Sequence, residues 1–554
     1  MEQAIMPFCV YSGKRPSVLS LVLVCVGALA PARTYAQCTP EWRAGPGAVG
    51  VNGDVYALKS WDPDGSGPQQ PVLVAGGAFT TAGGQPALRI ASWNGSDWSP
   101  LGSGISGSAS VNVRALAVLN DNSLVAAGID ILSAGGTTAW SIARWNGSAW
   151  SSMGTTAVPG LNNDAYSLHV LPNGDLIAGG VFTNAGGVAA SRVASWNGTT
   201  WTGFPAGVAS VRALTSLPNG DIIAGGTFGG AVGPDVSRWD GTQWNAMGSG
   251  LGGTFGGENV YALVTLPSGE AFAAGSYSTS GANTVRYASR FDGTSWNEMY
   301  TGLANAGFYA ALQRANGDLV GGTNWTTAYP GASSAAVQWD GTQWNIMAYF
   351  DGGGGPFVSA MAEHNGELYV GGRFSIVMDG ALTFTANGVA RFGNPTPIFT
   401  QEPVSTSVCH TAQTQFSASA TGGAPLMYEW QIETSAGIWT PLTTAPLALP
   451  CGSIATTGQG TEQISVVVSG CAGTFVHRVR AVATSPCGAT PSTPATLKIC
   501  TADCDCNAVL NIFDYICFGN EYASSTQYAD CDGNGNLNIF DYICFGNAYA
   551  AGCP

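Results

Sequence analysis

The sequence predicts a mainly β protein in which four-stranded units repeat, followed by a smaller β domain and a short helical tail. Three observations predict this class. Only 10% of the residues are charged while 45% are apolar, which argues against disorder. Glycine is abundant, at 78 of 554 residues, without the three-residue period of collagen. An aromatic-Asn/Asp-Gly triplet recurs about every fifty residues, which indicates a repeat architecture.

Each repeat contains four strand signals. In the clearest copy the strands begin at Ala165, Asp175, Arg192 and Thr199, and their alternating apolar residues favour strands over helices. Asn-Gly in the triplet predicts a tight type I′ hairpin between the third and fourth strands, in which both central residues need positive φ. The triplets begin at Trp93, Trp145, Trp196, Trp239, Phe291 and Trp339, with a degenerate seventh copy at Phe392.

The number of strands predicts how the repeats close. First strands begin near Val55, Val113, Ala165, Val211, Val260, Phe308 and Phe357. The last repeat lacks the Trp-containing fourth strand, and the matching pattern stands at Trp42, before the first repeat. We therefore expect an N-terminal strand to pair into the last repeat. This pairing would close a seven-bladed β-propeller over residues 37–397 and remove two sheet edges.

A family resemblance supports this fold. Gly-Gly doublets such as Gly179-Gly180, an aromatic residue ending the third strand and a Trp in the fourth resemble kelch-type propellers. We expect the doublets to let backbones approach where blades converge. The resemblance implies the fold alone, because kelch propellers host both binding and catalysis. We interpret the tryptophans as packing between blades, and His169 and His364 as structural strand residues.

Residues 398–499 read as about seven short strands. Trp430 resembles the buried Trp of an immunoglobulin-like third strand, and the segment 476–483 resembles the sixth strand. An Ig-like β-sandwich that acts as a spacer or weak adhesion module is therefore expected. The four cysteines here allow three pairings, of which the positions favour Cys409 with Cys487 and Cys451 with Cys471.

The N-terminal segment predicts secretion. Lys14 and Arg15 precede an apolar run over 18–30, and Ala36 stands at a cleavage position, so residues 1–36 read as a signal peptide. The run is too short to span a bilayer comfortably. Of 14 cysteines, 12 remain after cleavage, an even number that suits disulfides in an oxidising compartment. We expect a secreted protein, extracellular, on the cell surface or in the periplasm, without a transmembrane segment in the mature chain.

The tail, residues 500–554, contains an exact duplication. The string LNIFDYICFGN occurs at 510–520 and again at 537–547, each time after an acidic loop. Side-chain oxygens at positions 1, 3, 5, 9 and 12, with a backbone carbonyl at position 7, have the spacing of a calcium loop. The predicted ligands are Asp503, Asp505, Asn507, Val509, Asn511 and Asp514 in the first loop and Asp530, Asp532, Asn534, Asn536, Asn538 and Asp541 in the second.

The two calcium sites are expected to differ in strength. Gly535 supplies the turn at position 6 of the second loop, whereas the first loop has Ala508, whose Cβ disfavours positive φ. The second site should therefore bind Ca²⁺ more strongly. The shared thirteen-residue spacing of Cys504/Cys517 and Cys531/Cys544 is consistent with one loop-to-helix disulfide in each copy.

Two loop-helix copies with Asp at position 12 resemble the type I dockerin of bacterial polysaccharide-degrading systems. The resemblance implies a small helical, calcium-binding domain that docks on a cohesin-like partner through residues at the start of each helix. By position these are Ile512, Phe513, Ile539 and Phe540. A sorting tag or an attachment to a cell-surface protein is the alternative.

Charge and composition limit the function. A net charge of -15 disfavours nucleic acid as a partner. We expect a secreted, non-catalytic binding or surface protein whose propeller recognises a polysaccharide or protein ligand. The alternatives are a polysaccharide-degrading enzyme, a glycoside hydrolase or lyase, and a purely structural surface protein. No catalytic residue is predicted, because the acids recur at equivalent turn positions in a scaffold pattern. They are Asp175, Asp221, Glu270, Asp318 and Glu367.

Overall fold

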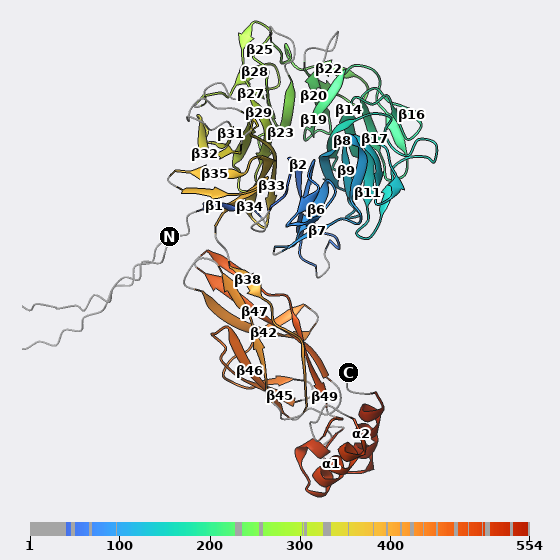
Figure 1. Cartoon of the computed structure of the whole chain (residues 1–554), viewed down its shortest axis with the longest axis vertical. Coiled ribbons are helices and arrows are strands. Elements are labelled where there is room, and N and C mark those ends of the chain that lie inside the picture. Colours follow the sequence, from blue (N-terminus) through green and yellow to red (C-terminus); the bar gives the residue numbers. More distant parts are fainter. Residues whose placement is uncertain are drawn as a thin grey trace, which may run out of the picture. The chain divides into compact units, whose positions relative to one another are not determined.

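The computed structural model describes residues 40–551, except 46–49, 66–68, 96, 228–234, 254–258, 302, 304–306, 325–333, 353, 381, 395–396, 410–412, 422–425, 436, 450–451, 470–474, 486, 501, 505–509 and 532–535. Within this part the chain is mainly β, with two α-helices and one 3-10 helix. Figure 1 shows three parts: a repeat region (40–394), a second β domain (397–500) and a helical tail (502–551). The predicted signal peptide, 1–36, lies outside the described residues.

The repeats fold into seven antiparallel sheets, each with four main strands, among the residues described. We number the sheets by the order of their first strands. Sheets 1 to 3 are β2 (Val55–Trp61), β3 (Val72–Gly77), β6 (Ile90–Trp93) and β7 (Trp98–Pro100); β8 (Ile105–Val118), β9 (Leu124–Ala134), β11 (Ile142–Trp145) and β12 (Trp150–Ser152); and β13 (Ala165–Val170), β14 (Leu176–Gly180), β17 (Val193–Trp196) and β18 (Trp201–Gly203).

Sheets 4 to 7 repeat the same order of pairing. They are β19 (Ser210–Ser216), β20 (Ile222–Thr227), β21 (Val236–Trp239) and β22 (Trp244–Ala246); β23 (Val260–Thr265), β24 (Ala271–Gly275), β27 (Ala288–Phe291) and β28 (Trp296–Glu298); β29 (Phe308–Gln313), β30 (Leu319–Thr323), β31 (Ser334–Trp339) and β32 (Trp344–Asp351); and β33 (Phe357–His364), β34 (Glu367–Arg373), β37 (Val389–Gly393) and β1 (Glu41–Ala44).

Short strands extend these sheets or form hairpins beside them. Two sheets are extended: β10 (Thr137–Thr138) pairs with β9, and β35 (Ile376–Asp379) and β36 (Leu382–Thr385) continue sheet 6 beyond β32. The hairpins are β4 (Thr81–Ala82) with β5 (Gln85–Pro86), β15 (Asn184–Ala185) with β16 (Val188–Ala189), and β25 (Thr279–Ser280) with β26 (Asn283–Thr284).

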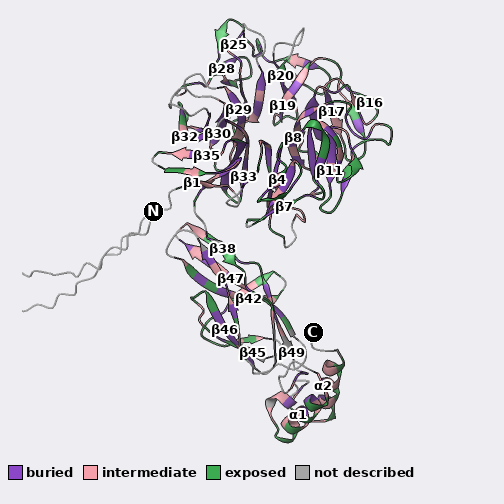
Figure 2. Ribbon diagram, in the orientation of Figure 1, coloured by how far each residue is buried: buried purple, intermediate pink, exposed green. Residues whose placement is uncertain are grey.

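First strands of successive sheets lie in contact. β2 contacts β8, and the contacts continue through β13, β19, β23 and β29 to β33, which in turn contacts β2. Second strands such as β14, β24 and β30 are buried along their whole length, and Figure 2 shows the buried residues concentrated in the inner strands. Their small side chains, alanine and glycine, allow sheets to pack closely on both faces.

The predicted pairing of the N-terminal strand is confirmed. β1 is antiparallel to β37, with Trp42 opposite Phe392, and it forms the fourth strand of sheet 7. Trp42 is buried and its indole nitrogen donates to the backbone oxygen of Met347 in sheet 6. Fourth-strand tryptophans in other sheets also donate to the preceding sheet, at 2.5 to 3.0 Å, which confirms their packing role. The pairs are Trp150 to Leu101, Trp201 to Met153, Trp296 to Met247 and Trp344 to Met299.

The predicted type I′ hairpin is wrong. Trp196 pairs with Trp201, so four residues rather than two form the loop. Gly198 has φ of +100°, but Asn197 does not have positive φ. Instead the Asn197 side-chain oxygen accepts from the backbone N–H groups of Thr199 and Thr200, at 3.0 and 2.9 Å. This side-chain bond organises the turn, so only the glycine needs the left-handed conformation.

The predicted role of the glycine doublets is confirmed. A Cβ added at Gly76, the first glycine of its doublet, would lie 2.5 Å from Cγ1 of Val113 in the next sheet. The same contact recurs at the first glycine of three other doublets: Gly179 faces Val211, Gly225 faces Val260 and Gly371 faces Val55. In sheet 6 the second glycine, Gly322, makes this contact with Val358. One glycine of each doublet therefore makes room for the neighbouring sheet.

The second β domain has two main sheets and one core. The first sheet consists of β39 (Thr406–Cys409), β49 (Ala495–Cys500), β47 (Phe475–Ser485), β42 (Met427–Ser435) and β43 (Ile438–Pro441), and β48 (Gly488–Pro491) pairs with β47. The second sheet consists of β40 (Gln413–Ser417), β46 (Gln463–Ser469), β45 (Gly452–Thr457) and β44 (Leu447–Leu449). A further pair is formed by β38 (Ile398–Gln401) and β41 (Ser419–Thr421). Trp430 is fully buried, and its ring lies 6.3 Å from that of Phe416 in the other sheet. Cys487 is disulfide-bonded, but the side chain of its predicted partner Cys409 lies outside the described part of the chain, as do Cys451 and Cys471, so both pairings stay predictions.

The helical tail is built from two equivalent halves. α1 (Ile512–Ala523) and α2 (Ile539–Ala551) flank η1 (Gln527–Ala529). The rings of Phe518 and Phe545 stack at 4.3 Å in the centre, and each also meets a tyrosine of the other helix edge to face. The predicted disulfides are confirmed: Cys504 joins Cys517 and Cys531 joins Cys544, each with Cα atoms 5.8 Å apart.

Candidate functional site

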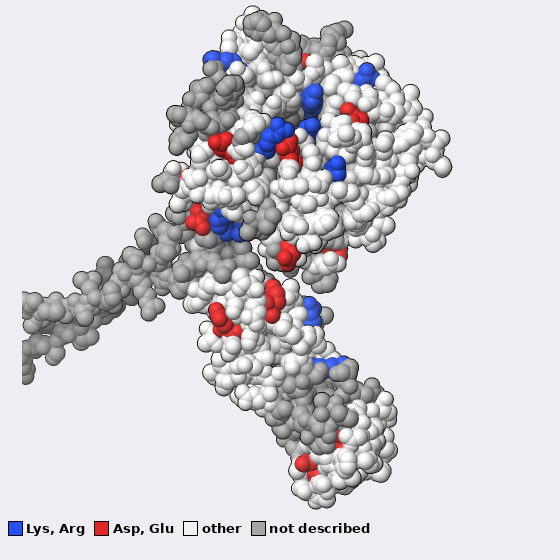
Figure 3. Space-filling view, viewed as in Figure 1, with Lys and Arg blue, Asp and Glu red and all other residues white. Residues whose placement is uncertain are grey.

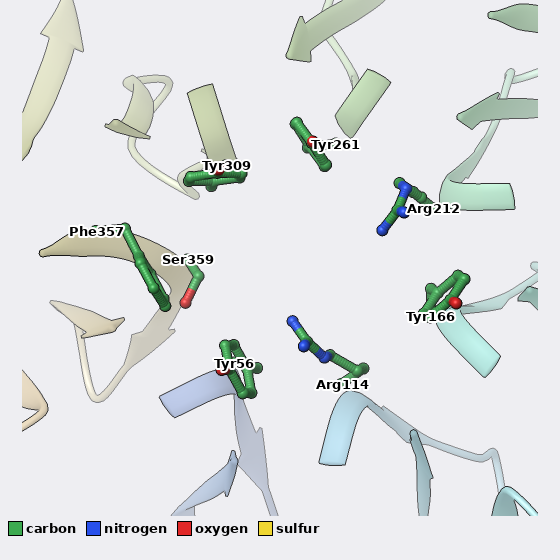
Figure 4. A pocket seen from close by; sticks show the side chains of 8 residues that line it. All are labelled: Tyr56, Arg114, Tyr166, Arg212, Tyr261, Tyr309, Phe357 and Ser359. Atoms are coloured by element: carbon green, nitrogen blue, oxygen red, sulfur yellow. The ribbon is translucent and has the colours of Figure 1, made fainter. Parts of the chain in front are cut away.

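One cavity of about 350 Å³ opens where the first strands of the repeat region begin. Figure 4 shows it from close by, with side chains from all around converging on an open centre. Its lining comes from all seven sheets: Tyr56, Arg114, Tyr166, Arg212, Tyr261, Tyr309, Phe357 and Ser359. We call this set the ring.

Seven of the ring residues occupy the same structural position. In every sheet the pairing between the first and second strands skips a residue that belongs to the ring, and sheet 2 has two further register shifts earlier in β8. The skipped residues are Tyr56, Arg114, Tyr166, Arg212, Tyr261, Tyr309 and Ser359. A bulge leaves one residue out of the ladder and re-aims its side chain. The fold therefore presents seven unpaired positions to one cavity.

In four of the five doublets the second glycine leaves room for the bulge. A Cβ added at Gly77 would overlap the backbone oxygen of Asp54, and one added at Gly180 would overlap that of Asp164. Both oxygens belong to the residue two positions before the ring residue. Glycine leaves this space, so in these sheets the doublet both packs the sheets and lets the first strand bend toward the cavity. Sheet 6 differs, because Thr323 stands at the equivalent position and the bulge is kept.

Half of the ring is an aromatic wall. The centroids of the aromatic side chains of Tyr261 and Tyr309 lie 4.8 Å apart, and those of Tyr309 and Phe357 lie 5.9 Å apart. The side chain of Phe357 stacks on that of Tyr56, with centroids 6.0 Å apart. Four sheets, 5, 6, 7 and 1, thus contribute one continuous surface of side-chain rings. Burial raises the pKa of Tyr56 and of Tyr261, so their hydroxyl groups stay neutral.

The other half of the ring is cationic. Arg114 and Arg212 come from sheets 2 and 4, with Tyr166 of sheet 3 between them, and Figure 4 shows both guanidinium groups pointing into the cavity. Each Nε is held by a buried asparagine, Arg114 by Asn112 at 2.7 Å and Arg212 by Asn259 at 2.9 Å. These bonds fix the side chains and leave the terminal nitrogens directed at the cavity.

Aromatic faces hold the two guanidinium groups as well. The guanidinium carbon of Arg114 lies 3.8 Å from the aromatic centroid of Tyr56. The guanidinium carbon of Arg212 lies 4.9 Å from the aromatic centroid of Tyr166 and 5.7 Å from that of Tyr261. Within the described residues neither arginine has a carboxylate within 4.0 Å. Burial lowers the pKa of Arg114, and the charge of Arg212 acts in the same direction. The two cations are therefore close, partly desolvated and not neutralised by an ion pair.

The acids at the edge of the cavity are engaged elsewhere. Asp54 forms a two-pronged ion pair with Arg373, at 2.5 and 2.9 Å, and accepts from the Tyr56 hydroxyl at 2.7 Å. Burial would raise the pKa of Asp54, but the bonds from Arg373 and Tyr56 outweigh it and lower the pKa. Asp164 accepts from the Tyr166 hydroxyl at 3.5 Å. In Figure 3, Lys and Arg atoms gather near the centre of this face beside a smaller acidic group.

Two further basic side chains lie on first strands, each three residues after a tyrosine of the ring. Lys59 of β2 and His169 of β13 interact electrostatically across sheet 2, where the equivalent residue is the small Ala117. Burial, together with the charge of Lys59, lowers the pKa of His169 to about 4. His169 also shares a hydrogen bond of 2.9 Å with Ser216. Three residues beyond the ring, these two first strands therefore carry a positive and a neutral group.

The recurrent acids of the repeats have structural partners, as expected. Asp221 lies 3.5 Å from Arg238, Glu270 lies 3.5 Å from Arg290, and Glu367 pairs with Arg391 at 3.3 Å and also with Arg43. Each pair links the start of a second strand to another strand of the same sheet. None of these acids lines the cavity. The histidines expected to be structural are also bonded within the fold, His364 to Ser60 at 2.9 Å.

The predicted calcium ligands are only partly within the described residues. Asp503, Asn511, Asp514, Asp530, Asn536, Asn538 and Asp541 are described, whereas Asp505, Asn507, Val509, Asp532 and Asn534 are not. The carboxylates at position 12 are fully buried. Asp514 accepts from the backbone of Cys504 and Asn511 at 2.9 and 2.8 Å, and Asp541 accepts from Asn538 at 2.7 Å. Across the described parts of the chain no group of three His, Cys, Asp or Glu could hold a metal ion. Calcium binding stays a prediction.

The predicted partner-binding residues are exposed. Ile512, Phe513, Ile539 and Phe540 have exposed fractions between 62% and 65%. Ile516 and Ile543, one turn further along each helix, are exposed as well and were not predicted. The two helices thus carry equivalent apolar surfaces.

Comparisons with known proteins give little further information. No family model and no curated protein matches the chain. Solved structures with some likeness include a Bacteroides ovatus protein named Xyloglucan PUL GH43B (10% identity, 69% of this chain, 89% of that chain, TM-score 0.22). Another is a chimeric titin Z1Z2 carrying a decorin peptide (21% identity, 19% and 92%, TM-score 0.14). At such TM-scores they do not indicate what this chain binds or catalyses. No helix in the described residues is long and apolar enough to cross a membrane.

Proposed function

We propose that this is a secreted, non-catalytic binding protein, and that its repeat region is a closed seven-bladed, kelch-like propeller with a ligand site at the ring. The observation that carries the proposal is the ring itself. Seven sheets place one bulged residue each at a single cavity, and six of these are tyrosine or arginine rather than the apolar residues of the strand interior. The volume lies at the lower end of the roughly 300–1,000 Å³ of protein ligand sites.

The ring favours binding over hydrolysis. Glycoside hydrolases generally need two carboxyl groups at the scissile bond, one of them as a general acid. The described lining contains none, and the nearby Asp54 is held by Arg373. Tyrosine and arginine offer stacking faces and hydrogen-bond donors, which suit recognition. A hydrolase or lyase would be the second candidate, and a test of turnover separates the two.

Secretion, an Ig-like spacer and a calcium-dependent tail complete the proposal. The disulfides of the tail suit an oxidising compartment. The equivalent apolar surfaces at Ile512, Phe513, Ile539 and Phe540 support attachment to a cohesin-like or cell-surface partner through either helix. Buried carboxylates at position 12 of each loop are compatible with two Ca²⁺ sites, the second stronger because of Gly535.

The binding proposal is tested with the mature protein on an array of plant and bacterial glycans, followed by a reducing-sugar assay on every glycan retained. We expect retention without sugar release. Tyr309→Ala should abolish retention, whereas Leu382→Ala, at an exposed site on β36, should not. Release of reducing sugar would favour the hydrolase, and retention unaffected by Tyr309→Ala would reject the ring as the site.

The calcium proposal is tested by titrating the metal-free mature chain with Ca²⁺ in a calorimeter. We expect two sites of unequal affinity. Asp541→Asn should remove the tighter site and Asp514→Asn the weaker one, because each takes the charge from position 12 of one loop. A titration without heat, or with the first loop tighter, would contradict the proposal or the ranking respectively.

A further inference from the structure

The cavity has two chemically different sides. On sheets 5, 6, 7 and 1 the aromatic wall offers flat apolar faces, and on sheets 2 and 4 two guanidinium groups face it (Figure 4). A ligand that fills the space must have an apolar face on one side and hydrogen-bond acceptors, preferably charged, on the other. The lining therefore restricts the ligand more than a purely aromatic site would.

Charge is scarce in this chain, so its position is informative. Lys and Arg together number 19 of 554 residues, and the net charge is -15. Two of these cations, Arg114 and Arg212, meet in one cavity without a carboxylate partner in the described residues, and Lys59 stands three residues beyond Tyr56. Two like charges in a partly buried site repel each other unless an anion lies between them. The free site is thus prepared for a negative group.

The number of charges favours a singly charged ligand. Arg373 is already neutralised by Asp54, and Asp164 lies close to Tyr166. The excess of positive charge at the ring is therefore small, and a polyanion would also be repelled by the acidic chain as a whole. A carboxylate matches the planar donor forks of two arginines.

We infer that the ring binds a carboxylated sugar, a uronic acid residue, with its ring on the aromatic wall and its carboxylate between Arg114 and Arg212. The C–H faces of a pyranose ring pack on Tyr and Phe, and its hydroxyl groups can bond to the neutral tyrosine hydroxyls. This inference rests on the proposed binding function and specifies the chemistry of its ligand.

The test compares matched pairs of sugars that differ only at C6. D-glucuronate with D-glucose, and D-galacturonate with D-galactose, are titrated into the full mature chain at low salt, with binding followed by ligand-observed NMR. We expect at least one uronate to bind ten-fold or more tighter than its neutral partner, because a bond to a charged group contributes on the order of ten-fold or more in affinity. Added salt should reduce the difference.

Variants assign the selectivity to the two arginines. Arg114→Gln and Arg212→Gln should each bring uronate affinity toward that of the neutral sugar. Arg286→Gln, which removes the same charge from an exposed pair with Glu298, should leave it unchanged. Hydrogen exchange of the first-strand peptides reports whether each variant keeps its fold.

The outcomes separate the inference from the proposed function. Equal affinity for uronate and neutral sugars, lost in Tyr309→Ala, would overturn the inference and leave ring binding intact. Uronate selectivity that persists in both arginine variants would also overturn it, as would tighter binding of a C6-sulfated sugar than of the uronate. If no glycan binds at the ring in either experiment, the proposed function fails together with the inference.

Discussion

The repeat region and the helical tail both arise from repeated sequence, yet they use repetition in opposite ways. In the tail the two copies are identical over LNIFDYICFGN, and they build two equivalent halves around Phe518 and Phe545. In the repeat region the copies keep the same strands, doublets and turns, but differ at the bulged position, which is Tyr, Arg or Ser.

This difference teaches where variation is tolerated. A bulged residue makes no ladder bonds and faces a cavity, so its side chain can change without disturbing the sheet. A helix residue such as Phe518, at 0% exposure, cannot change without opening the core of both halves. One region thus combines a constant scaffold with a variable ring, and the other preserves two equal surfaces.

The largest expected effect is in the core of the tail. Phe518→Ala and Phe545→Ala should each destabilise the tail by about 3–5 kcal/mol, because a large ring is removed from a closed core. Phe518→Ala should cost slightly more, since Phe518 also meets Tyr528, at 6.0 Å. Hydrogen exchange of peptides from α1 and α2 in the full chain measures both. Very unequal losses would break the equivalence of the halves.

A smaller effect is expected on the pH dependence of stability, which should differ between the repeat region and the tail. Burial lowers the pKa of His364 from 6.5 to about 4, so the unfolded chain binds a proton between these values that the folded chain does not. Stability from this residue is complete above pH 6.5 and falls as the pH drops toward 4, by up to about 3 kcal/mol. The tail has no histidine, so its stability has no such dependence on histidine protonation.

The measurement is hydrogen exchange in β33 and α2 between pH 7 and pH 4, corrected for the intrinsic rate. Exchange from β33 should accelerate in the parent chain and less so in His364→Gln, which keeps a neutral hydrogen-bonding group near Ser60. An identical pH response in the variant would contradict the assignment to His364.

A third test addresses the two glycines of one doublet. Gly180→Ala would force a Cβ onto the backbone oxygen of Asp164, whereas Gly179→Ala would meet the Val211 side chain and the Ser167 hydroxyl. We expect Gly180→Ala to cost about 1–3 kcal/mol and to displace the bulge at Tyr166, and Gly179→Ala to cost less. Thermal unfolding and sugar binding report the two effects. If only Gly179→Ala impairs binding, the doublet does not set the bulge as described.

The smallest expected effect is a gain. Arg212→Gln should stabilise the repeat region by up to about 1 kcal/mol, because it relieves the repulsion on Arg114. Arg212 suits this test because its partner Asn259 also accepts a bond from Thr227 and stays satisfied. A drop in the unfolding temperature would show that the two cations are stabilised within the fold.

Much of the fold could be predicted from particular residues. The sequence predicted the pairing of the Trp42 strand, the packing role of the glycine doublets and the disulfides Cys504/Cys517 and Cys531/Cys544. Each of these features depends on a fixed spacing of residues along the chain. The type I′ turn was not, because the side-chain bond of Asn197 to Thr199 replaces the backbone geometry that Asn-Gly usually indicates.

The ring escaped prediction for a physical reason. Its signal was present: in six of the first strands predicted from the sequence the second residue is Tyr or Arg, and in five of these it stands between apolar neighbours. Strand alternation assigns such a residue to an ordinary sheet face, and only the register shift, visible at Val55/Ala57 and its equivalents, turns it toward a shared cavity.

The pairing of β1 with β37 also imposes an order in time. Arg43 and Asn394 lie 351 residues apart and share a hydrogen bond of 3.1 Å. A strand made near the start of the chain must therefore wait, with its edge unpaired, until the last repeat has been synthesised. Such distant contacts slow folding and expose edges that invite association. We expect any fragment that ends before Val389 to leave sheet 7 without two strands, so that completion of this region is a property of the whole chain rather than of its successive repeats.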